Sequence, residues 1–563
     1  MTDAERMEEP LPEERVEKDI KEKRSGGGLS NRYLSFLLKL KSKPMKIMIP
    51  TEVSKGPLDV ITEIPKISDA GVDEVEISRI TDPYSFVRIK YDNVGGEYLY
   101  EVIEPNLSGD ERNLLELLKD ALIMTLNLAE IESKAQKEEI LNKATDALMK
   151  TFGVTLHPIS KDRIMYFIRR DFIGYGAIDV MMNDPNVEDC SCDGVDIPLY
   201  IYHRKYGSIR SNIRFVKEVE LDAFVVWLAQ KCGKHISVAD PLLDATIPDG
   251  SRLNATLGKY VTKRGSSFTI RRFKENPFTP IDLLKFRTMS TDMMAYLWIA
   301  TEYGSSMLVC GGTASGKTTT LNAVLLFIPP QMKIVSIEDT RELNLPHENW
   351  IPSLTREGFG GRGSNKTGTI DMFELLTTAL RQRPQYLMVG EVRGKEAYVV
   401  FQAMATGKTA YSTFHAEDVQ AMVHRMENDP INLPRALMTA LDIVLLQAQV
   451  KVGTKMTRRV KSLTEIVGMD PETGELITNA VHTWNPADDT FNFSGHSYVF
   501  EKVRTIRNWS PREMEREVKR RVDILDYMKK IGVDNYKQVA SIISAYYKDP
   551  EKVIKEIREK LTE

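Results

Sequence analysis

The stretch that decides the fold of the C-terminal half is Ser306 to Phe327, SMLVCGGTASGKTTTLNAVLLF. Its beginning, SMLVC, is a short apolar run typical of a buried strand, and its end, TTLNAVLLF, has the pattern of a helix. Between them, Gly311 to Thr318 fits G-x-x-x-x-G-K-[ST], in which glycines let backbone N–H groups turn toward a phosphate. The sequence therefore predicts a phosphate-binding loop between a strand and a helix.

The constrained positions of this loop each have a chemical role. The ammonium group of Lys317 reaches the β and γ phosphates of a nucleotide, and the hydroxyl group of Thr318 binds Mg²⁺. We therefore expect ATP and Mg²⁺ as ligands, and a Gly-rich turn without nucleotide is the alternative interpretation. The residues of the loop expected to bind nucleotide are Gly311, Gly312, Thr313, Ala314, Ser315, Gly316, Lys317, Thr318 and Thr319.

Two further apolar strands each end in carboxylates. The run YLMVGE, ending at Glu391, has the form of the second P-loop element, whose acid orders magnesium and its waters. The run IVSIED ends in Glu338, which can orient and deprotonate the attacking water, and in Asp339, which can cap the following turn. The alternative is that these acids only end buried strands.

A histidine and five arginines complete the candidate site. His415 follows the strand Thr409 to Thr413, where an imidazole can contact a terminal phosphate, although a lone histidine is by default a satisfied surface or core residue. Guanidinium groups stabilise charge on a transferring phosphoryl group, and ordinary ion pairing is the alternative. The arginines considered for this role are Arg252, Arg271, Arg272, Arg381 and Arg383.

Composition bounds the class of protein. The chain has 563 residues, 28% of them charged, and a net charge of −4, which gives no general attraction to nucleic acid. No apolar run approaches the ~20 residues of a membrane helix, and the charged N-terminus is unlike a secretory signal, so we expect a cytoplasmic protein. Its four cysteines predict reduced thiols, and their spacing predicts no zinc site.

The order of predicted elements divides the chain. Strands and helices that alternate after residue 291 favour an α/β domain with a mainly parallel sheet between helices, preceded by α+β regions. The predicted parts are a charged tail (1–31), an α+β subdomain (32–155), a second α+β domain with its linker (156–290), and the nucleotide domain with a C-terminal helical bundle (291–563). A Gly-rich insert, Gly360 to Gly368, is predicted to be a mobile loop.

Four segments in this order resemble a known family: GGTASGKTTT, SIEDTRE, ALRQRPQYLMVGEVRG and STFHAED. They are similar to the motor ATPases of type II secretion, type IV pili and the archaeal swimming filament, and most similar to the archaeal members. The resemblance extends upstream through RDFIGYGAIDVMMNDPNVEDCSCDGVDIPLYIYHRKYG and DGSRLNATLG, and so covers roughly residues 80 to 550.

The resemblance implies a ring of six copies, each with a PAS-like N-terminal domain and a RecA-like ATPase domain. By position, Glu338 would be the catalytic carboxylate, Glu391 would support Mg²⁺ together with Thr318, and His415 would belong to a histidine box. Arg252, Arg271 and Arg272 match N-terminal arginines that approach the nucleotide.

The resemblance also implies a partner, a polytopic membrane platform protein beneath which the ring docks. The resemblance implies that the chain would drive assembly or rotation of a pilus, an archaellum or a secretion pseudopilus, and the sequence does not choose among them. It departs from the family in lacking a four-cysteine zinc subdomain, and in having Lys408 where many relatives have a second histidine.

The main alternative is a RecA-like translocase or helicase that acts on nucleic acid. A channel that tracks a strand should concentrate lysine, arginine and stacking aromatic residues, and no such stripe occurs in this acidic chain. We therefore expect no nucleic-acid partner. A GTPase is less expected, because the chain lacks the N-K-x-D element that usually recognises guanine. A small-molecule kinase would need an acceptor pocket. A scaffold that binds nucleotide without hydrolysing it would require Glu338 or Glu391 to be misplaced.

Overall fold

The computed structural model describes residues 61–67, 71–126, 133–273, 276–356, 368–453 and 455–562. The chain divides into two compact units, the first ending at Arg272 and the second beginning at Phe273. The predicted tail (1–31) and residues 360–367 of the predicted Gly-rich loop lie outside the described residues. Within the described ranges, no helix has both the length and the apolar character needed to span a membrane.

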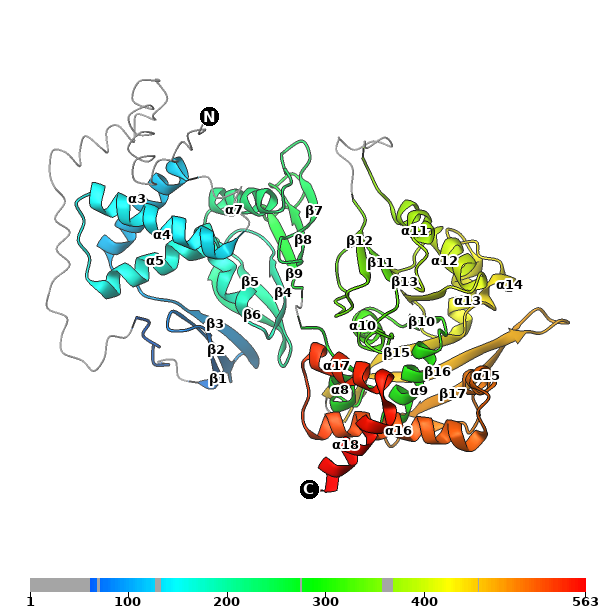
Figure 1. The fold of residues 1–563 in the computed structure, drawn as a ribbon. Helices are drawn as coiled ribbons and strands as arrows, with labels where there is room; N and C mark the ends of the chain where they lie inside the picture. The colour runs from blue at the N-terminus through cyan, green and yellow to red at the C-terminus, as the bar shows by residue number, and fades with distance from the viewer. Residues whose placement is uncertain are drawn as a thin grey trace, which may run out of the picture. The chain divides into compact units, whose positions relative to one another are not determined.

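The first unit contains one nine-stranded sheet. Its strands are β1 (Val72–Thr81), β2 (Ser85–Asp92), β3 (Glu97–Ile103), β4 (Val187–Cys192), β5 (Pro198–His203), β6 (Gly207–Arg214), β7 (Leu242–Thr246), β8 (Arg252–Thr256) and β9 (Ser267–Arg271). They lie in the order β1-β2-β3-β6-β5-β4-β9-β8-β7 (Figure 1). All neighbours are antiparallel except β3 and β6.

The sheet has one apolar and one polar face where β5 and β9 lie. In β5, buried Leu199 and Ile201 alternate with more exposed Tyr200 and Tyr202, because successive side chains of a strand point to opposite sides. The buried side chains join one core with helices α6 (Asp179–Asn183) and α7 (Glu218–Lys231). The polar face is therefore left for solvent or a ligand.

A second core of the first unit lies among three helices. These are α3 (Gly109–Thr125), α4 (Lys134–Thr151) and α5 (Pro158–Phe172), which bury Leu118, Leu141 and Ile164 against one another. The boundary predicted after residue 155 differs from this arrangement. Helix α5 packs with α3 and α4, whereas β2 and β3 pack into the same sheet and core as residues beyond 177, so the two cores interleave along the sequence.

The second unit contains the other nine-stranded sheet. Its strands are β10 (Met307–Cys310), β11 (Ile334–Glu338), β12 (Trp350–Leu354), β13 (Tyr386–Glu391), β14 (Thr409–Phe414), β15 (Ile443–Val452), β16 (Lys455–Met469), β17 (Leu476–Asn485) and β18 (Thr490–Phe493). Their order is β12-β11-β13-β14-β10-β15-β16-β17-β18. The first six strands in this order, β12, β11, β13, β14, β10 and β15, are parallel to one another, as predicted. Strands β16, β17 and β18 extend the sheet with antiparallel pairs that the sequence analysis did not name.

Helices cover both faces of this sheet (Figure 1). The central strand β10 turns Met307 and Val309 toward one apolar core and Leu308 and Cys310 toward the other. Full burial of one such side chain is worth about 1.5–3 kcal/mol, so this alternation fixes the orientation of the strand. The helices on the Met307 side are α8 (Pro280–Lys285), α9 (Thr291–Glu302), α10 (Lys317–Leu325), α15 (Tyr498–Arg507), α16 (Pro511–Lys530), α17 (Tyr536–Lys548) and α18 (Pro550–Thr562). The helices on the Leu308 side are α11 (Met372–Arg381), α12 (Glu396–Ala405), α13 (Val419–Glu427) and α14 (Arg435–Met438).

Residues 276–290, the end of the stretch predicted to be the second α+β domain with its linker, belong largely to this second core. Thr279 and Asp282 form a capping box that starts α8, and Ile281 and Leu284 are buried beside α9 and α10. The division between the units accordingly falls after Arg272 and not near residue 290. The apolar residues of α8 explain the difference, because burying their side chains in this core stabilises the fold, whereas a linker would leave them exposed to water.

Candidate active site

The topology of the second sheet brings its functional residues to one edge. Because β11, β13, β14 and β10 are parallel neighbours, their C-terminal ends meet there. Glu338 ends β11, Glu391 ends β13, His415 follows β14, and the loop from Gly311 follows β10. Residues that are up to about a hundred positions apart in the chain are thus assembled side by side.

The loop after β10 adopts a shape that only glycine permits at two positions. The N–H of Gly311 donates to the carbonyl of Phe414 (3.2 Å), and a Cβ on Gly311 would lie 2.1 Å from the carbonyl oxygen of Gln447. Gly316 has a left-handed φ of 93° and begins α10 with no side-chain cap. The first N–H groups of α10 are therefore available to an anion, so the loop fits the phosphates of a nucleotide.

Lys317 lies between the loop and the end of β14. Its ammonium group donates to the carbonyl of Gly312 (2.9 Å) and lies 3.5 Å from Nδ1 of His415. Burial, which leaves Lys317 only 9% exposed, lowers the pKa of this group. The hydroxyl of Ser315 donates to the same carbonyl (2.9 Å), and Thr318 follows in the first turn of α10, where its half-buried side chain can offer an oxygen to Mg²⁺.

His415 connects Lys317 to Glu391. Its Nε2 lies 2.9 Å from Oε1 of Glu391, and the guanidinium group of Arg393 contacts the other oxygen. Burial, and then the nearby charge of Lys317, lowers the pKa of His415 and keeps the ring neutral at pH 7. His415 therefore stands between the ammonium group of Lys317 and the carboxylate of Glu391, whose Oε1 is buried and has no hydrogen-bond partner among the described residues.

A register shift in the sheet places Glu391. The pairing of β13 with β14 keeps a regular register up to Val389, and the register shifts between Val389 and Glu391. Irregularities of this kind re-aim a side chain at the end of a strand. The carboxylate thereby reaches His415 at the edge where the loop lies.

Glu338 is a buried carboxylate with one satisfied and one free oxygen. It is 2% exposed, and its Oε1 accepts from the N–H groups of Glu342 and Leu343 (2.9 Å each). Among the described residues, Oε2 has no hydrogen-bond partner although it is buried. Burial raises the pKa of Glu338 to about 7, against the effect of the two N–H groups. A carboxyl group poised near neutral pH is suited to accept a proton from water.

Gly390 lets the two acidic strands approach. A Cβ at Gly390 would lie 3.3 Å from Cγ of Glu338, closer than ordinary van der Waals contact. The absence of a side chain there allows Glu338 to lie directly beside the strand that ends in Glu391. The two carboxylates singled out from the sequence are therefore brought together by the structure.

Two residues that the sequence analysis did not identify hold the loop from outside. Nε2 of Gln447 on β15 donates to the carbonyl of Ser315 (2.8 Å), and Nε of Arg458 on β16 donates to the carbonyl of Ala314 (3.0 Å). These contacts join positions 132 and 144 residues apart. No local motif signals them, and only the pairing of β10, β15 and β16 makes them.

The family known as type II/IV secretion system protein matches residues 196–550. The chain belongs to this family. It is 38% identical over 476 residues to an uncharacterized protein of Methanocaldococcus jannaschii, covering 80% of this chain and 85% of that one. It is 29% identical over 274 residues to the type IV secretion system protein PtlH of Bordetella pertussis (43% and 79%). The crystal structure of the VirB11 ATPase of Brucella suis in complex with sulphate is 20% identical, with a TM-score of 0.27 over 51% of this chain and 91% of that one.

The protein is accordingly an ATP hydrolase of the type II/IV secretion machinery. The oxygen donors at the loop edge, Thr318 and Glu391, are of the kind that Mg²⁺ prefers. In the part of the chain that the structure describes, no group of three or more His, Cys, Asp and Glu side chains could hold a metal ion. The four cysteines are free thiols.

The structure does not bring Arg381 and Arg383 to the loop of the same chain. Arg381 ends α11, and Arg383, with a positive φ of 54°, lies in the turn before β13. Both therefore lie at the N-terminal edge of the sheet, and the six residues of β13, at about 3.3 Å each, separate them from the edge that carries Glu391. The expected catalytic role of these two exposed arginines stays a prediction, because a guanidinium group supplied by another subunit can serve a site that lies away from its own loop.

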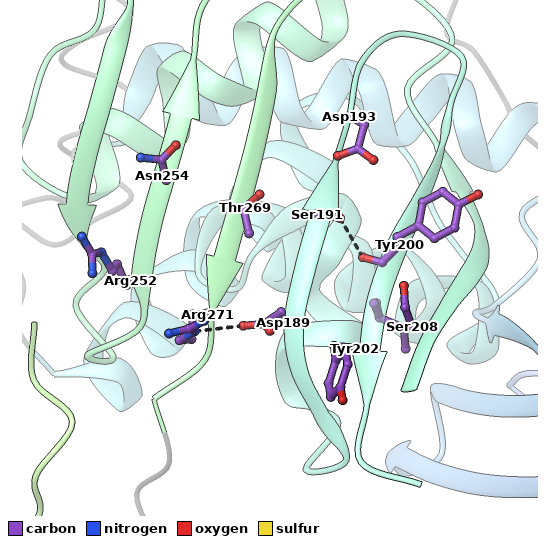
Figure 2. A pocket seen from close by; sticks show the side chains of 11 residues that line it. Asp189, Ser191, Asp193, Tyr200, Tyr202, Ser208, Arg252, Asn254, Thr269 and Arg271 are labelled. Carbon is purple, nitrogen blue, oxygen red and sulfur yellow. Dashed lines mark hydrogen bonds and ion pairs between the residues drawn. The ribbon is translucent and has the colours of Figure 1, made fainter. Parts of the chain in front are cut away.

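In the first unit, Arg252 and Arg271 share the polar face of the sheet. They are direct cross-strand partners on β8 and β9, and each is paired with a carboxylate, Asp244 (2.6 Å) for Arg252 and Asp189 (3.3 Å) for Arg271. They line a hollow of about 500 Å³, which Figure 2 shows together with Tyr200 and Tyr202. Their expected contact with a nucleotide stays a prediction.

Arg272 lies apart from these two arginines. As the next residue along the chain, it turns to the other side, and its half-buried guanidinium group donates to the carbonyls of Asp184 and Val187 (3.1 Å to the latter). Burial lowers its pKa. The contacts of Arg272 within its own unit indicate a structural role, and its expected contact with a nucleotide also stays a prediction.

Proposed function

We propose that this secretion ATPase is a hexameric motor that uses ATP hydrolysis to drive assembly or rotation of a type IV pilus-like filament, working at the cytoplasmic face of a membrane platform protein. The observation that carries the proposal is the assembly of Lys317, His415, Glu391 and Glu338 at one edge of the sheet, in a chain of the type II/IV secretion family. Bound Mg²⁺ would neutralise charge on the β and γ phosphates.

The residues have distinct parts in hydrolysis. Lys317 exchanges its contact with the Gly312 carbonyl for a phosphate oxygen, and the N–H groups at the start of α10 hold the remaining charge. The free Oε2 of Glu338 accepts a proton from the attacking water as the water oxygen bonds to the γ phosphorus, and the bond from that phosphorus to the bridging oxygen breaks so that ADP leaves. Because His415 touches both Lys317 and Glu391, a change at the terminal phosphate reaches Glu391 through one side chain.

The experiment that tests the motor role is steady-state ATP hydrolysis by the full chain and by Glu338→Gln. Each is measured alone, with the cytoplasmic face of a candidate platform protein, and with DNA. Stimulation by the platform alone, lost in Glu338→Gln, supports a filament motor. Stimulation by DNA alone would replace it with the translocase interpretation.

The hexamer is tested separately, because a ring is part of the proposal and not of the fold. Light scattering of the full chain with a non-hydrolysable ATP analogue should give six times the 64.0 kDa of one chain. A particle that stays at one chain under these conditions and in the presence of the platform contradicts the ring.

A further inference from the structure

The phosphate-binding loop has an outer side that faces β15 and β16. A loop that turns its N–H groups inward to phosphate turns carbonyl groups outward, where side-chain donors can hold them. Three of these carbonyls have side-chain donors. Gly312 accepts from Ser315 and Lys317 within the loop, whereas Ala314 and Ser315 accept from Arg458 and Gln447, which belong to other strands.

Gln447 occupies the position where β15 passes the end of β10. Cys310, the last residue of β10, pairs with Leu446, and β15 continues for six residues beyond it. The pairing of β15 with β16 shifts register between Leu446 and Gln447, which turns the Gln447 side chain toward the loop. Gln447 is 2% exposed, and its backbone carbonyl lies so close to Gly311 that no side chain fits there. The loop therefore rests directly on this strand.

Arg458 holds the position of the loop that is most strained. Ala314 has a left-handed φ of 58°, an unfavourable conformation for a residue with a Cβ. The Nε of Arg458 holds its carbonyl at 3.0 Å, and the aliphatic part of Arg458 lies 3.1 Å from where a Cβ on Gly316 would be. The next residue, Arg459, is buried and paired with Asp489 at 2.7 Å, which fixes β16 at this point.

We infer that Gln447 and Arg458 are positioning residues that hold the phosphate-binding loop in its binding-competent shape before nucleotide arrives. They act through the carbonyls of Ser315 and Ala314, so they favour any nucleotide whose β phosphate occupies the loop, ADP as well as ATP. Once ATP is bound, the phosphates themselves hold the loop, and the rate at saturating ATP depends little on either residue. This inference rests on ATP binding at the loop and is independent of the filament role.

The test compares Arg458→Ala, Arg458→Lys and Gln447→Met with Lys451→Ala, which removes an exposed cation from the same hairpin. ADP affinity is measured by isothermal titration of each variant, and ATP affinity in the non-hydrolysing Glu338→Gln background. For Arg458→Ala and Gln447→Met we expect the Kd for both nucleotides to rise roughly tenfold, the change worth about 1.4 kcal/mol for one lost hydrogen bond. Arg458→Lys keeps a donor and should lose less, and Lys451→Ala should match the wild type.

Steady-state kinetics in the otherwise wild-type chain supply the second readout. The KM for ATP should rise with the Kd while kcat stays within about twofold, because the lost interaction is present before chemistry. An unchanged Kd in both Arg458→Ala and Gln447→Met would overturn the inference. A loss confined to ATP would also overturn it, since Arg458 would then be a ligand of the γ phosphate. If the wild-type chain binds no nucleotide, the assignment of the loop as a nucleotide-binding site is itself wrong.

Discussion

Replacing Glu338 with glutamine separates the chemistry of this carboxylate from its cost to the fold. Glutamine keeps an oxygen that can accept from the N–H groups of Glu342 and Leu343, but it has no carboxylate to take a proton from water. We expect Glu338→Gln to bind ATP with wild-type affinity and to lose turnover by at least about a hundredfold, the usual worth of a general base. Hydrolysis at the normal rate would refute the assignment of the base.

The raised pKa of Glu338 sets the pH dependence of the wild-type enzyme. Because burial raises this pKa to about 7, the free enzyme holds Glu338 protonated below that pH and ionised above it. A general base must be ionised, so kcat/KM should rise with pH and level off above a midpoint near pH 7. A profile that is flat from about pH 5.5 to about pH 8 would show that Glu338 titrates elsewhere or is not the base.

The same shift predicts a change in stability. The ordinary pKa of the carboxyl group is 4.5, so between pH 4.5 and about 7 the unfolded chain releases a proton that the folded chain keeps, and stability falls as pH rises. Above pH 7 both states are ionised, and the full penalty is about 3 kcal/mol at about 1.4 kcal/mol per pKa unit. About 2 kcal/mol of it develops between pH 5.5 and pH 8.

Urea unfolding at these two pH values measures this loss. Tryptophan fluorescence reports mainly on the second unit, which contains four of the five tryptophans: Trp298, Trp350, Trp484 and Trp509. The wild type should lose about 2 kcal/mol more than Glu338→Gln between the two conditions. Glu417→Gln, which removes an exposed carboxylate near the same edge, should behave as the wild type. Equal pH dependence in the wild type and Glu338→Gln would refute the reasoning about burial.

Three further predictions follow from other contacts in the second unit. Lys317→Ala should abolish nucleotide binding in calorimetry, because the loop loses its ammonium group, and retained affinity would contradict its role. Gly311→Ala places a Cβ 2.1 Å from the carbonyl of Gln447, so both the melting temperature and ATP affinity should fall, whereas an unchanged melting temperature would mean that the loop can shift. Arg521→Met removes a buried partner of Glu517 (2.8 Å) and should cost about 3–5 kcal/mol in urea unfolding, and a loss under about 1 kcal/mol would contradict the value of this pair.

The parts of the protein that the sequence alone determined are those whose constraints are local. The strand Met307–Cys310, the turn at Gly316 and the helix from Lys317 are contiguous, so one short stretch specifies them all. The acidic strands that end in Glu338 and Glu391 were also predictable, since an apolar run followed by a carboxylate is visible within six residues.

The tertiary structure decided which of these pieces meet. The parallel order of β11, β13, β14 and β10 gathers the acids, His415 and the loop at one edge, and the length of β13 keeps Arg381 and Arg383 away from it. It also brings Gln447 and Arg458 to the loop, over separations of 132 and 144 residues. Periodicity in a sequence reports which side chains are buried, but it does not report which strand lies beside which, because that is set by packing between segments far apart in the chain.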